Sequence, residues 1–126
     1  MRTGPPLILC IDDDQDLLDS MQVLLGKAGY AVETATCVEA AVARYKAKAP
    51  DLVVVDLMME EADSGLTFVK RIQQLGPTPP VYLLSAVGAD LSSMTEFSKM
   101  GLTDVLQKPV DPATLIRLIQ AKLGKA

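Results

Sequence analysis

Several residue types are scarce or missing in this chain of 126 residues. It has no histidine, so any reaction through a phosphohistidine needs the histidine of another molecule. It has two cysteines, Cys10 in an apolar run and Cys37 near a predicted helix start, which indicates two thiols rather than a structural disulfide or a metal site. The net charge of -4 argues against binding nucleic-acid phosphates as the main activity.

Long hydrophobic runs are also missing. The apolar runs reach about five residues, whereas a membrane span needs about 20. Asp12 interrupts the first run before a signal-peptide core could form, so we expect no membrane binding and predict a cytoplasmic protein. Because there is no internal repeat, low-complexity segment or long linker, we predict a single domain over residues 1–126.

Strand-like runs alternate with segments of helical spacing along the chain. The strands are expected at 7–11, 30–35, 51–56, 81–85 and 104–107. Runs such as 52–55 are apolar without alternation, which is typical of parallel strands that are covered on both faces. The pattern therefore predicts an α/β fold with a doubly wound parallel sheet and five helices.

Local signals predict where the first two helices begin and end. Apolar residues recur at three- and four-residue spacing after the acidic triplet 12–14, and Gly26 and Gly29 are predicted to close that helix. The segment 36–39, Thr-Cys-Val-Glu, has the form of a capping box, and the second helix is predicted to stop before Pro50.

Three further helices follow. The third is predicted to start near Asp63 or Ser64 and to end at Gly-Pro 76–77, and the fourth to cover about 90–99. The fifth has Asp111 as its N-cap and Pro112 at its first position. Inward positions are predicted at Leu66, Val69, Ile72 and Leu75 in the third helix and at Leu115, Ile116, Leu118 and Ile119 in the fifth.

Four of the apolar runs stop at a side chain that can handle phosphate or a hard cation. These side chains are Asp12 with Asp13, then Asp56, Ser85 and Lys108. In an open parallel sheet the carboxyl ends of all strands lie at one edge, so we expect these groups to converge. Three clustered carboxylates repel one another, and one lysine cannot balance them, so a divalent cation, Mg²⁺ above others, is the expected partner.

A carboxylate, a metal, a hydroxyl and an ammonium around one point are the groups needed to move a phosphoryl group onto an aspartate. The carboxylate attacks, the metal and the lysine neutralise the phosphoryl oxygens, and the hydroxyl donates a hydrogen bond. The residues that supply them resemble the receiver domains of two-component response regulators, including the chemotaxis regulators. The resemblance covers about residues 6–124.

The resemblance implies a flavodoxin-like (βα)5 fold of three layers, with strand order 2-1-3-4-5. It implies that Asp56 is the phosphoacceptor and that Asp13, Asp56 and the backbone carbonyl of Met58 bind Mg²⁺, with Asp12 acting through water. Lys108 would pair with the phosphoryl group, and Ser85 would move toward it. The donor would be a histidine kinase or a histidine phosphotransfer protein, and the output a changed surface for a downstream protein or an output domain.

This chain departs from the family pattern at three places. Glu60 stands where the family usually has proline, and Gly65 comes nine places after Asp56 rather than eight, so the loop is longer and more acidic. Val105 stands where the family often has an aromatic residue, which predicts a weakened switch. Apolar residues stand two places after Asp56 and two places after Ser85, at Met58 and Val87, which predicts slow loss of phosphate.

Other interpretations compete with this one. We predict that Asp14 caps the first helix, and the alternative for Asp12 and Asp13 is that they also serve only that helix start. An interaction module with the same fold could act without phosphorylation, and a phosphatase resembling the haloacid dehalogenase family would use Asp12 as nucleophile with Asp14. We favour a signalling switch rather than an enzyme, with at most slow autodephosphorylation, acting alone or within a longer regulator. It would be a monomer or a weak phosphorylation-linked dimer.

Overall fold

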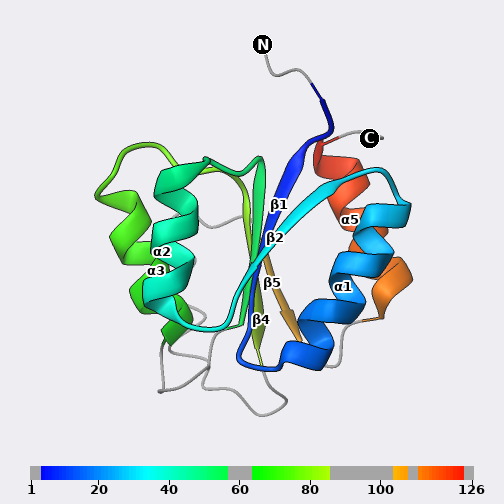
Figure 1. The fold of residues 1–126 in the computed structure, drawn as a ribbon, viewed down its shortest axis with the longest axis horizontal. Coiled ribbons are helices and arrows are strands. Elements are labelled where there is room, and N and C mark those ends of the chain that lie inside the picture. Colours follow the sequence, from blue (N-terminus) through cyan, green and yellow to red (C-terminus); the bar gives the residue numbers. More distant parts are fainter. Residues whose placement is uncertain (1–3, 57–63, 86–103, 108–110, 124–126) are drawn as a thin grey trace.

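The computed structural model describes residues 4–56, 64–85, 104–107 and 111–123, which form a parallel sheet with helices on both faces (Figure 1). The strands are β1 Leu7–Ile11, β2 Ala31–Ala35, β3 Leu52–Asp56, β4 Val81–Ser85 and β5 Asp104–Gln107. The helices are α1 Gln15–Lys27, α2 Val38–Ala47, α3 Ser64–Gln73 and α5 Pro112–Leu123. The predicted helix at 90–99 lies outside the described residues.

The strands lie in the order β2-β1-β3-β4-β5, and all neighbouring pairs are parallel. Every residue of β1 and β3 is buried, because helices cover both faces of these strands. This burial explains why the two sequences are apolar without alternation. The predicted α/β class with a parallel sheet is confirmed, and the complete (βα)5 pattern stays a prediction because it includes residues 90–99.

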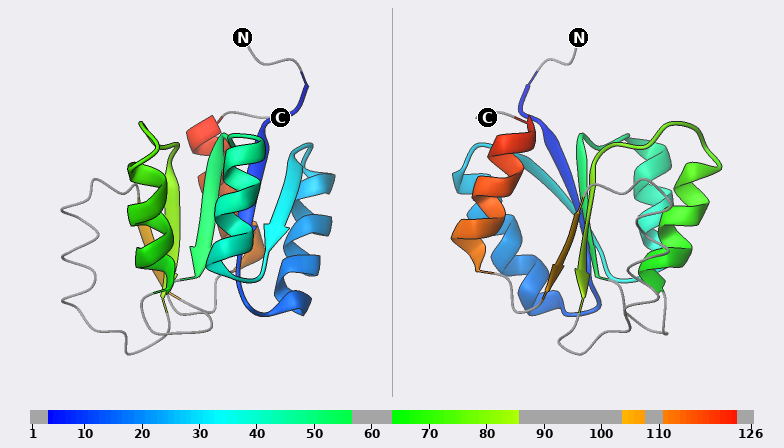
Figure 2. Two further views of the ribbon diagram at one scale, coloured as in Figure 1. Left: turned by 60° about the vertical axis from the view of Figure 1, so that its left-hand side comes forward. Right: turned by 180° about the vertical axis from the view of Figure 1, so that it is seen from behind.

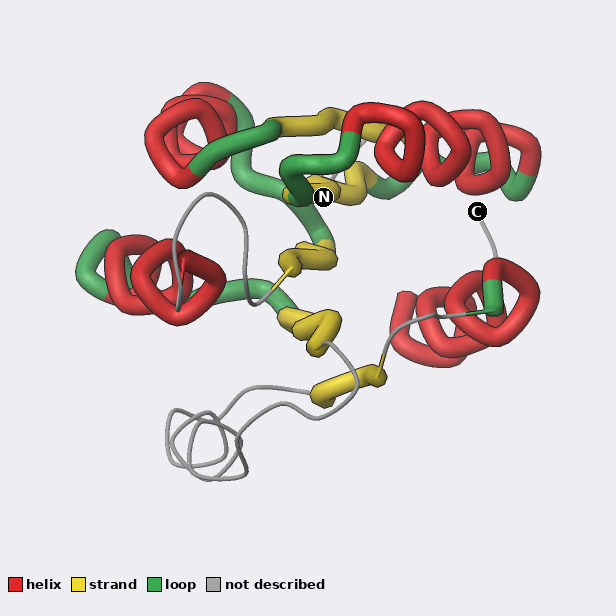
Figure 3. The backbone as a smooth tube through the Cα atoms, turned by 90° about the horizontal axis from the view of Figure 1, so that it is seen from below, coloured by secondary structure: helices red, strands yellow, loops and turns green. Residues whose placement is uncertain are grey.

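The helices form two layers, one on each face of the sheet. Helices α2 and α3 cover one face, and α1 and α5 cover the other (Figures 2 and 3). Successive strand residues point to opposite faces, so β1 sends Leu9 and Ile11 into the α2/α3 layer and Ile8 and Cys10 into the α1/α5 layer. Among the described helices, none combines the length and apolar character that crossing a membrane requires.

Helix α1 begins and ends with side-chain and backbone caps. The Asp14 carboxylate accepts hydrogen bonds from the backbone N–H groups of Asp16 and Leu17, at 3.0 and 3.3 Å, so the prediction that Asp14 caps this helix is confirmed. At the other end the N–H of Tyr30 donates to the Leu25 carbonyl, and Gly29 adopts a φ of 99°. These contacts form a Schellman motif around Gly29.

Gly26 was predicted to close α1 together with Gly29, and this part of the prediction is wrong. The helix continues through Gly26 to Lys27. Gly29 has the left-handed backbone conformation that ends a helix, whereas Gly26 is an exposed helical residue, and a glycine inside a helix costs only about 1 kcal/mol relative to alanine.

The predicted capping box at 36–39 is wrong. The N-cap of α2 is Cys37 rather than Thr36, and the Cys37 side chain makes no capping hydrogen bond. Val38 begins the helix because its side chain packs in the core. The Glu39 carboxylate accepts a hydrogen bond from Arg71 in α3 at 2.6 Å, so this side chain joins two helices.

Helix α3 begins at Ser64, as predicted, but ends at Gln73 rather than at Gly76. Val69 and Ile72 are buried as expected, whereas Leu75 lies past the helix end and is 51% exposed, so its predicted inward position is wrong. The side chain of Leu66 is outside the described part of the chain. The early end of the helix moves Leu75 off the spacing that would have turned it inward.

Helix α5 agrees with the sequence. Asp111 accepts hydrogen bonds from the backbone N–H and the hydroxyl of Thr114, at 3.2 and 3.1 Å, and the helix starts at Pro112. Leu115 and Ile119 are buried. Ile116 and Leu118, also predicted inward, are half-buried against the same layer.

Both cysteines are free thiols, as predicted. Cys10 is buried in β1, and this burial raises the pKa of its thiol from 9.0 to about 12. A thiol in this environment stays protonated at neutral pH and packs as a small apolar side chain.

Candidate functional site

The ends of two neighbouring strands bring three aspartates together. Asp12 directly follows β1, and Asp56 is the last residue of β3. Ile11 lies opposite Val55 in the sheet, so the next residues along both strands, Asp12 and Asp56, are also neighbours. Adjacent strands are about 4.8 Å apart, which places the two carboxylates within reach of one ligand.

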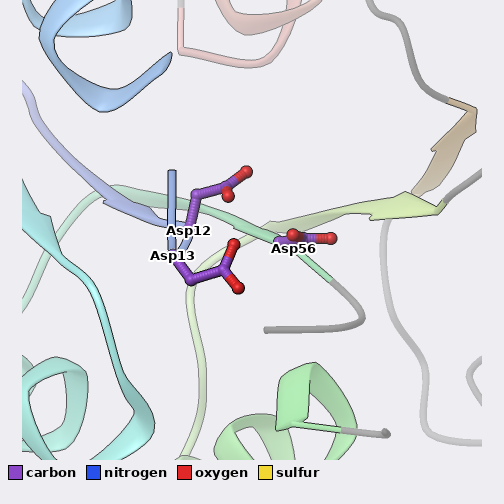
Figure 4. Close-up of side chains that lie close together, drawn as sticks. All are labelled: Asp12, Asp13 and Asp56. Carbon is purple, nitrogen blue, oxygen red and sulfur yellow. The ribbon is translucent and has the colours of Figure 1, made fainter. Parts of the chain in front are cut away.

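The three carboxylates form a compact cluster. One oxygen from each of Asp12, Asp13 and Asp56 lies within 4.8 Å of the other two (Figure 4). Asp12 and Asp56 are buried, with exposed fractions of 1% and 5%, whereas Asp13 is exposed. Two carboxylates of the cluster are therefore shielded from solvent, and the third is accessible to it.

Backbone contacts hold Asp12 in place. Its N–H donates to the carbonyl of Ala35, at the end of β2, at 3.1 Å. One of its carboxylate oxygens accepts a hydrogen bond from the N–H of Asp14 at 3.0 Å. The role of Ala35 could not be predicted, because a backbone acceptor leaves no mark in the side-chain pattern. Asp14 turns its own carboxylate to the first turn of α1 and is not a member of the cluster.

The cluster suits a small divalent cation. Three like charges this close repel one another, and carboxylate oxygens are the ligands that Mg²⁺ and Ca²⁺ prefer. Ligands on opposite sides of Mg²⁺ are about 4.2 Å apart, given metal–oxygen distances of about 2.1 Å. Separations of up to 4.8 Å are slightly wider, so a small closure or an intervening water would complete the fit.

The remaining predicted site residues fall mostly outside the described part of the chain. Ser85 ends β4 and pairs with Gln107 of β5, so its backbone lies at the same edge of the sheet as the cluster. The side chain of Ser85, and the whole of Met58 and Lys108, are outside the described residues. Their predicted roles stay predictions.

Comparison with known proteins decides the family. The chain matches the model of the response regulator receiver domain over residues 8–120. The chain belongs to this family. Receiver domains of two-component response regulators are phosphoacceptor switches rather than enzymes in their own right, and they generally bind Mg²⁺ through acidic residues. The predicted family and its signalling class are confirmed.

Curated relatives of this receiver domain include a 14.6 kDa protein from the sodA1 3′ region of Leptolyngbya boryana. The two are 35% identical over 115 residues, which cover 90% of this chain and 86% of that protein. The photosynthetic apparatus regulatory protein RegA of Rhodobacter capsulatus is 31% identical over 91% of this chain, but the match spans only 61% of RegA. The transcriptional regulatory protein GlrR of Escherichia coli is 32% identical, and the match covers 100% of this chain but 28% of GlrR.

Solved structures agree with this assignment. A response regulator receiver domain from Clostridium thermocellum superimposes with a TM-score of 0.83 at 28% identity, and the match covers 94% of each chain. The chemotaxis protein CheY4 of Vibrio cholerae gives a TM-score of 0.83 at 29% identity, covering 95% of this chain and all of CheY4. The receiver domain therefore shares its fold with both.

Proposed function

We propose that this receiver domain accepts a phosphoryl group on Asp56 and needs Mg²⁺ to do so. The observation that carries the proposal is the convergence of the Asp12, Asp13 and Asp56 carboxylates within 4.8 Å at the carboxyl edge of the sheet. A carboxylate of Asp56 attacks the phosphorus of a partner's phosphohistidine. The new phosphorus–oxygen bond forms as the phosphorus–nitrogen bond breaks, and the imidazole nitrogen takes the electron pair.

Each aspartate has a separate task in this proposal. Asp56 is the acceptor, and its burial limits the access of water to the acyl phosphate. Asp13 and Asp56 would hold the metal, together with the Met58 carbonyl, and Asp12 would act through water. When bound, the metal neutralises charge on the phosphoryl oxygens. Asp13 is exposed, so the metal and the donor can enter from its side.

Lys108 and Ser85 complete the proposed chemistry. The ammonium of Lys108 pairs with the phosphoryl group, and the Ser85 hydroxyl moves to donate a hydrogen bond to it. The complete fold in this proposal is a flavodoxin-like (βα)5 domain over about residues 6–124. Met58 and Val87 are apolar and cannot orient an attacking water, so the phosphoaspartate hydrolyses slowly.

The partners in this proposal follow from the absence of histidine. A histidine kinase or a histidine phosphotransfer protein donates the phosphoryl group, because this chain has no histidine of its own. The output is a change in binding to a downstream protein or an attached output domain, without direct contact with nucleic acid. By analogy with the family, the protein works in the cytoplasm, as a monomer or a weak phosphorylation-linked dimer.

The test is chemical labelling. The chain is incubated with MgCl₂ and acetyl phosphate, the added mass is measured on the intact protein, and the labelled residue is found by peptide mapping. We expect one phosphoryl group, on Asp56, that disappears in Asp56→Ala and requires Mg²⁺. Asp16→Ala is the matched control, because Asp16 is an exposed acid near the cluster but outside it.

Other outcomes would point elsewhere. A label on Asp12 that Asp12→Ala removes would indicate the phosphatase mechanism. A wild-type chain that takes up no label, from acetyl phosphate or from a phosphorylated phosphotransfer protein, would indicate a module that acts without phosphorylation.

A further inference from the structure

Tyr82, the second residue of β4, connects the sheet to α5. Its side chain is buried in the α1/α5 layer, with an exposed fraction of 3%. Its hydroxyl donates a hydrogen bond to the backbone carbonyl of Leu118, at 3.2 Å. Carbonyls inside a helix already accept a hydrogen bond from the N–H four residues later. The Tyr82 bond is therefore an added link between two elements.

The same strand lies beside the proposed phosphoacceptor. Leu84, two residues after Tyr82, is the partner of Asp56 in the pairing of β3 with β4. Residues two apart in a strand lie on the same face and about 7 Å apart, and Leu84 is buried in the same layer as Tyr82. Strand β4 thus runs from the neighbour of Asp56 to the hydrogen bond with α5.

Among the described residues, α5 also places aliphatic side chains in this layer. Leu115 and Ile119 belong to the same buried cluster as Tyr82 and Leu84. Apolar contacts have little directional preference, so a helix can shift along them at small cost. A hydrogen bond weakens steeply when its angle or length changes. Among the described contacts of α5 with the sheet, the Tyr82 hydroxyl therefore supplies a directional one that can set the position of the helix along the strand.

We propose that Tyr82 is a positioning residue that anchors α5 to β4 and transmits the phosphorylation state of Asp56 to α5. The proposal rests on the proposed function, because it assumes that Asp56 is phosphorylated. In this proposal, a shift of β4 at the phosphorylated edge moves the Tyr82 hydroxyl. The hydrogen bond to the Leu118 carbonyl is kept only if α5 moves with the strand. Tyr82 acts on the readout and takes no part in phosphoryl transfer.

The experiment uses the full chain, acetyl phosphate with MgCl₂ as the probe, and hydrogen–deuterium exchange of the α5 amides as the readout. Tyr82→Phe removes the hydroxyl and keeps the ring. Tyr45→Phe is the matched control, because Tyr45 is buried in the α2/α3 layer on the other face of the sheet. Ile119→Val trims the aliphatic packing of α5 and leaves the hydroxyl in place. Phosphate uptake is measured on the same samples by intact mass.

We expect Tyr82→Phe to take up phosphate like the wild type. Its α5 amides should exchange about 3- to 10-fold faster before phosphorylation, the size of effect expected when one buried hydrogen bond is lost. The change in α5 exchange on phosphorylation should fall to less than half of the wild-type change. Tyr45→Phe and Ile119→Val should keep the wild-type change.

Two results would overturn the proposal. One is a Tyr82→Phe chain that keeps the whole phosphate-dependent change in α5. The other is a wild type that is labelled on Asp56 but shows no change in α5 exchange. If the wild type takes up no phosphate, the proposed function fails and the transmission fails with it. That failure is recognised because the intact chain gains no phosphoryl mass. Amide exchange of α5 in the unphosphorylated wild type and Tyr82→Phe still decides whether Tyr82 anchors the helix.

Discussion

The two helical layers are fastened in different ways. In the α2/α3 layer the helices are joined to each other, by an ion pair of Arg71 with Glu39 at 2.6 Å and by the edge-to-face rings of Tyr45 and Phe68, 6.4 Å between centroids. In the α1/α5 layer, the side chain of Tyr82 in β4 donates a hydrogen bond to the backbone of α5, at the Leu118 carbonyl. The described contacts thus join α2 to α3 within their layer, whereas α5 is joined to a strand of the sheet.

The largest expected effect is the loss of Phe68, which lies in the α2/α3 layer with no exposed surface. Phe68→Ala removes a large buried ring and its contact with Tyr45, so the free energy of unfolding should fall by about 3–5 kcal/mol. Urea unfolding measures it. Leu75→Ala is the control, because Leu75 is 51% exposed and its loss should cost less than about 0.5 kcal/mol. Equal costs for the two would contradict the central place of Phe68.

The pH dependence of the free energy of unfolding tests the burial of Cys10 in the α1/α5 layer. Its pKa is raised from 9.0 to about 12 in the folded chain, so between these values the unfolded chain releases a proton that the folded chain keeps. The free energy of unfolding should therefore fall as the pH rises through this window, by up to about 1.4 kcal/mol per pH unit. Burial also raises the pKa of Tyr30 and Tyr45, which add to the fall at higher pH.

Variants separate the contribution of Cys10. Urea unfolding between pH 8 and pH 10 should show a shallower decline in Cys10→Ala than in the wild type, because the tyrosines are present in both. Cys37→Ala is the matched control for the loss of a thiol, since Cys37 is only half-buried. An unchanged slope in Cys10→Ala would mean that the Cys10 thiol ionises in the folded chain.

The next comparison is between the stability contributions of the residues at the N-terminal ends of α1 and α2. Asp14→Ala removes the two side-chain hydrogen bonds at the start of α1 and should lower the free energy of unfolding by about 1 kcal/mol. Thr36→Ala should cost less than about 0.5 kcal/mol, because Cys37 is the N-cap of α2. Thermal unfolding of both variants measures the difference. A loss at Thr36 as large as that at Asp14 would restore the capping box.

The smallest expected effect concerns the ion pair between α2 and α3. Arg71 and Glu39 are partly exposed, at 38% and 79%, so a double-mutant cycle with alanine should give a coupling of about 0.2–1 kcal/mol. The coupling should decline in about 0.5 M NaCl, which screens exposed charges. The Arg44–Glu33 pair, at 3.2 Å, joins α2 to β2 and is the matched comparison. A coupling that salt does not reduce would contradict a solvent-screened pair.

Local sequence signals predicted helix starts and ends well where a single residue determines them. Asp14 and Asp111 cap their helices, and Gly29 ends α1, because each provides a hydrogen bond or a backbone conformation that few other residues provide. The predictions failed at Gly26, Thr36 and Leu75. At these places several residues could start or end the helix, and the choice depends on packing with the rest of the fold, such as the burial of Val38 at the start of α2.

The sequence by itself determined the alternation of strands and helices, the parallel sheet and the aspartates at its strand ends, since apolar runs and helix caps act over a few residues. The convergence of Asp12, Asp13 and Asp56 was expected, but only the tertiary structure gives their separations of up to 4.8 Å and the burial of Asp12 and Asp56. It also decided that Tyr82 reaches the Leu118 carbonyl. These contacts join residues up to 44 positions apart, and their distances are set by strand register and packing, which no local pattern encodes.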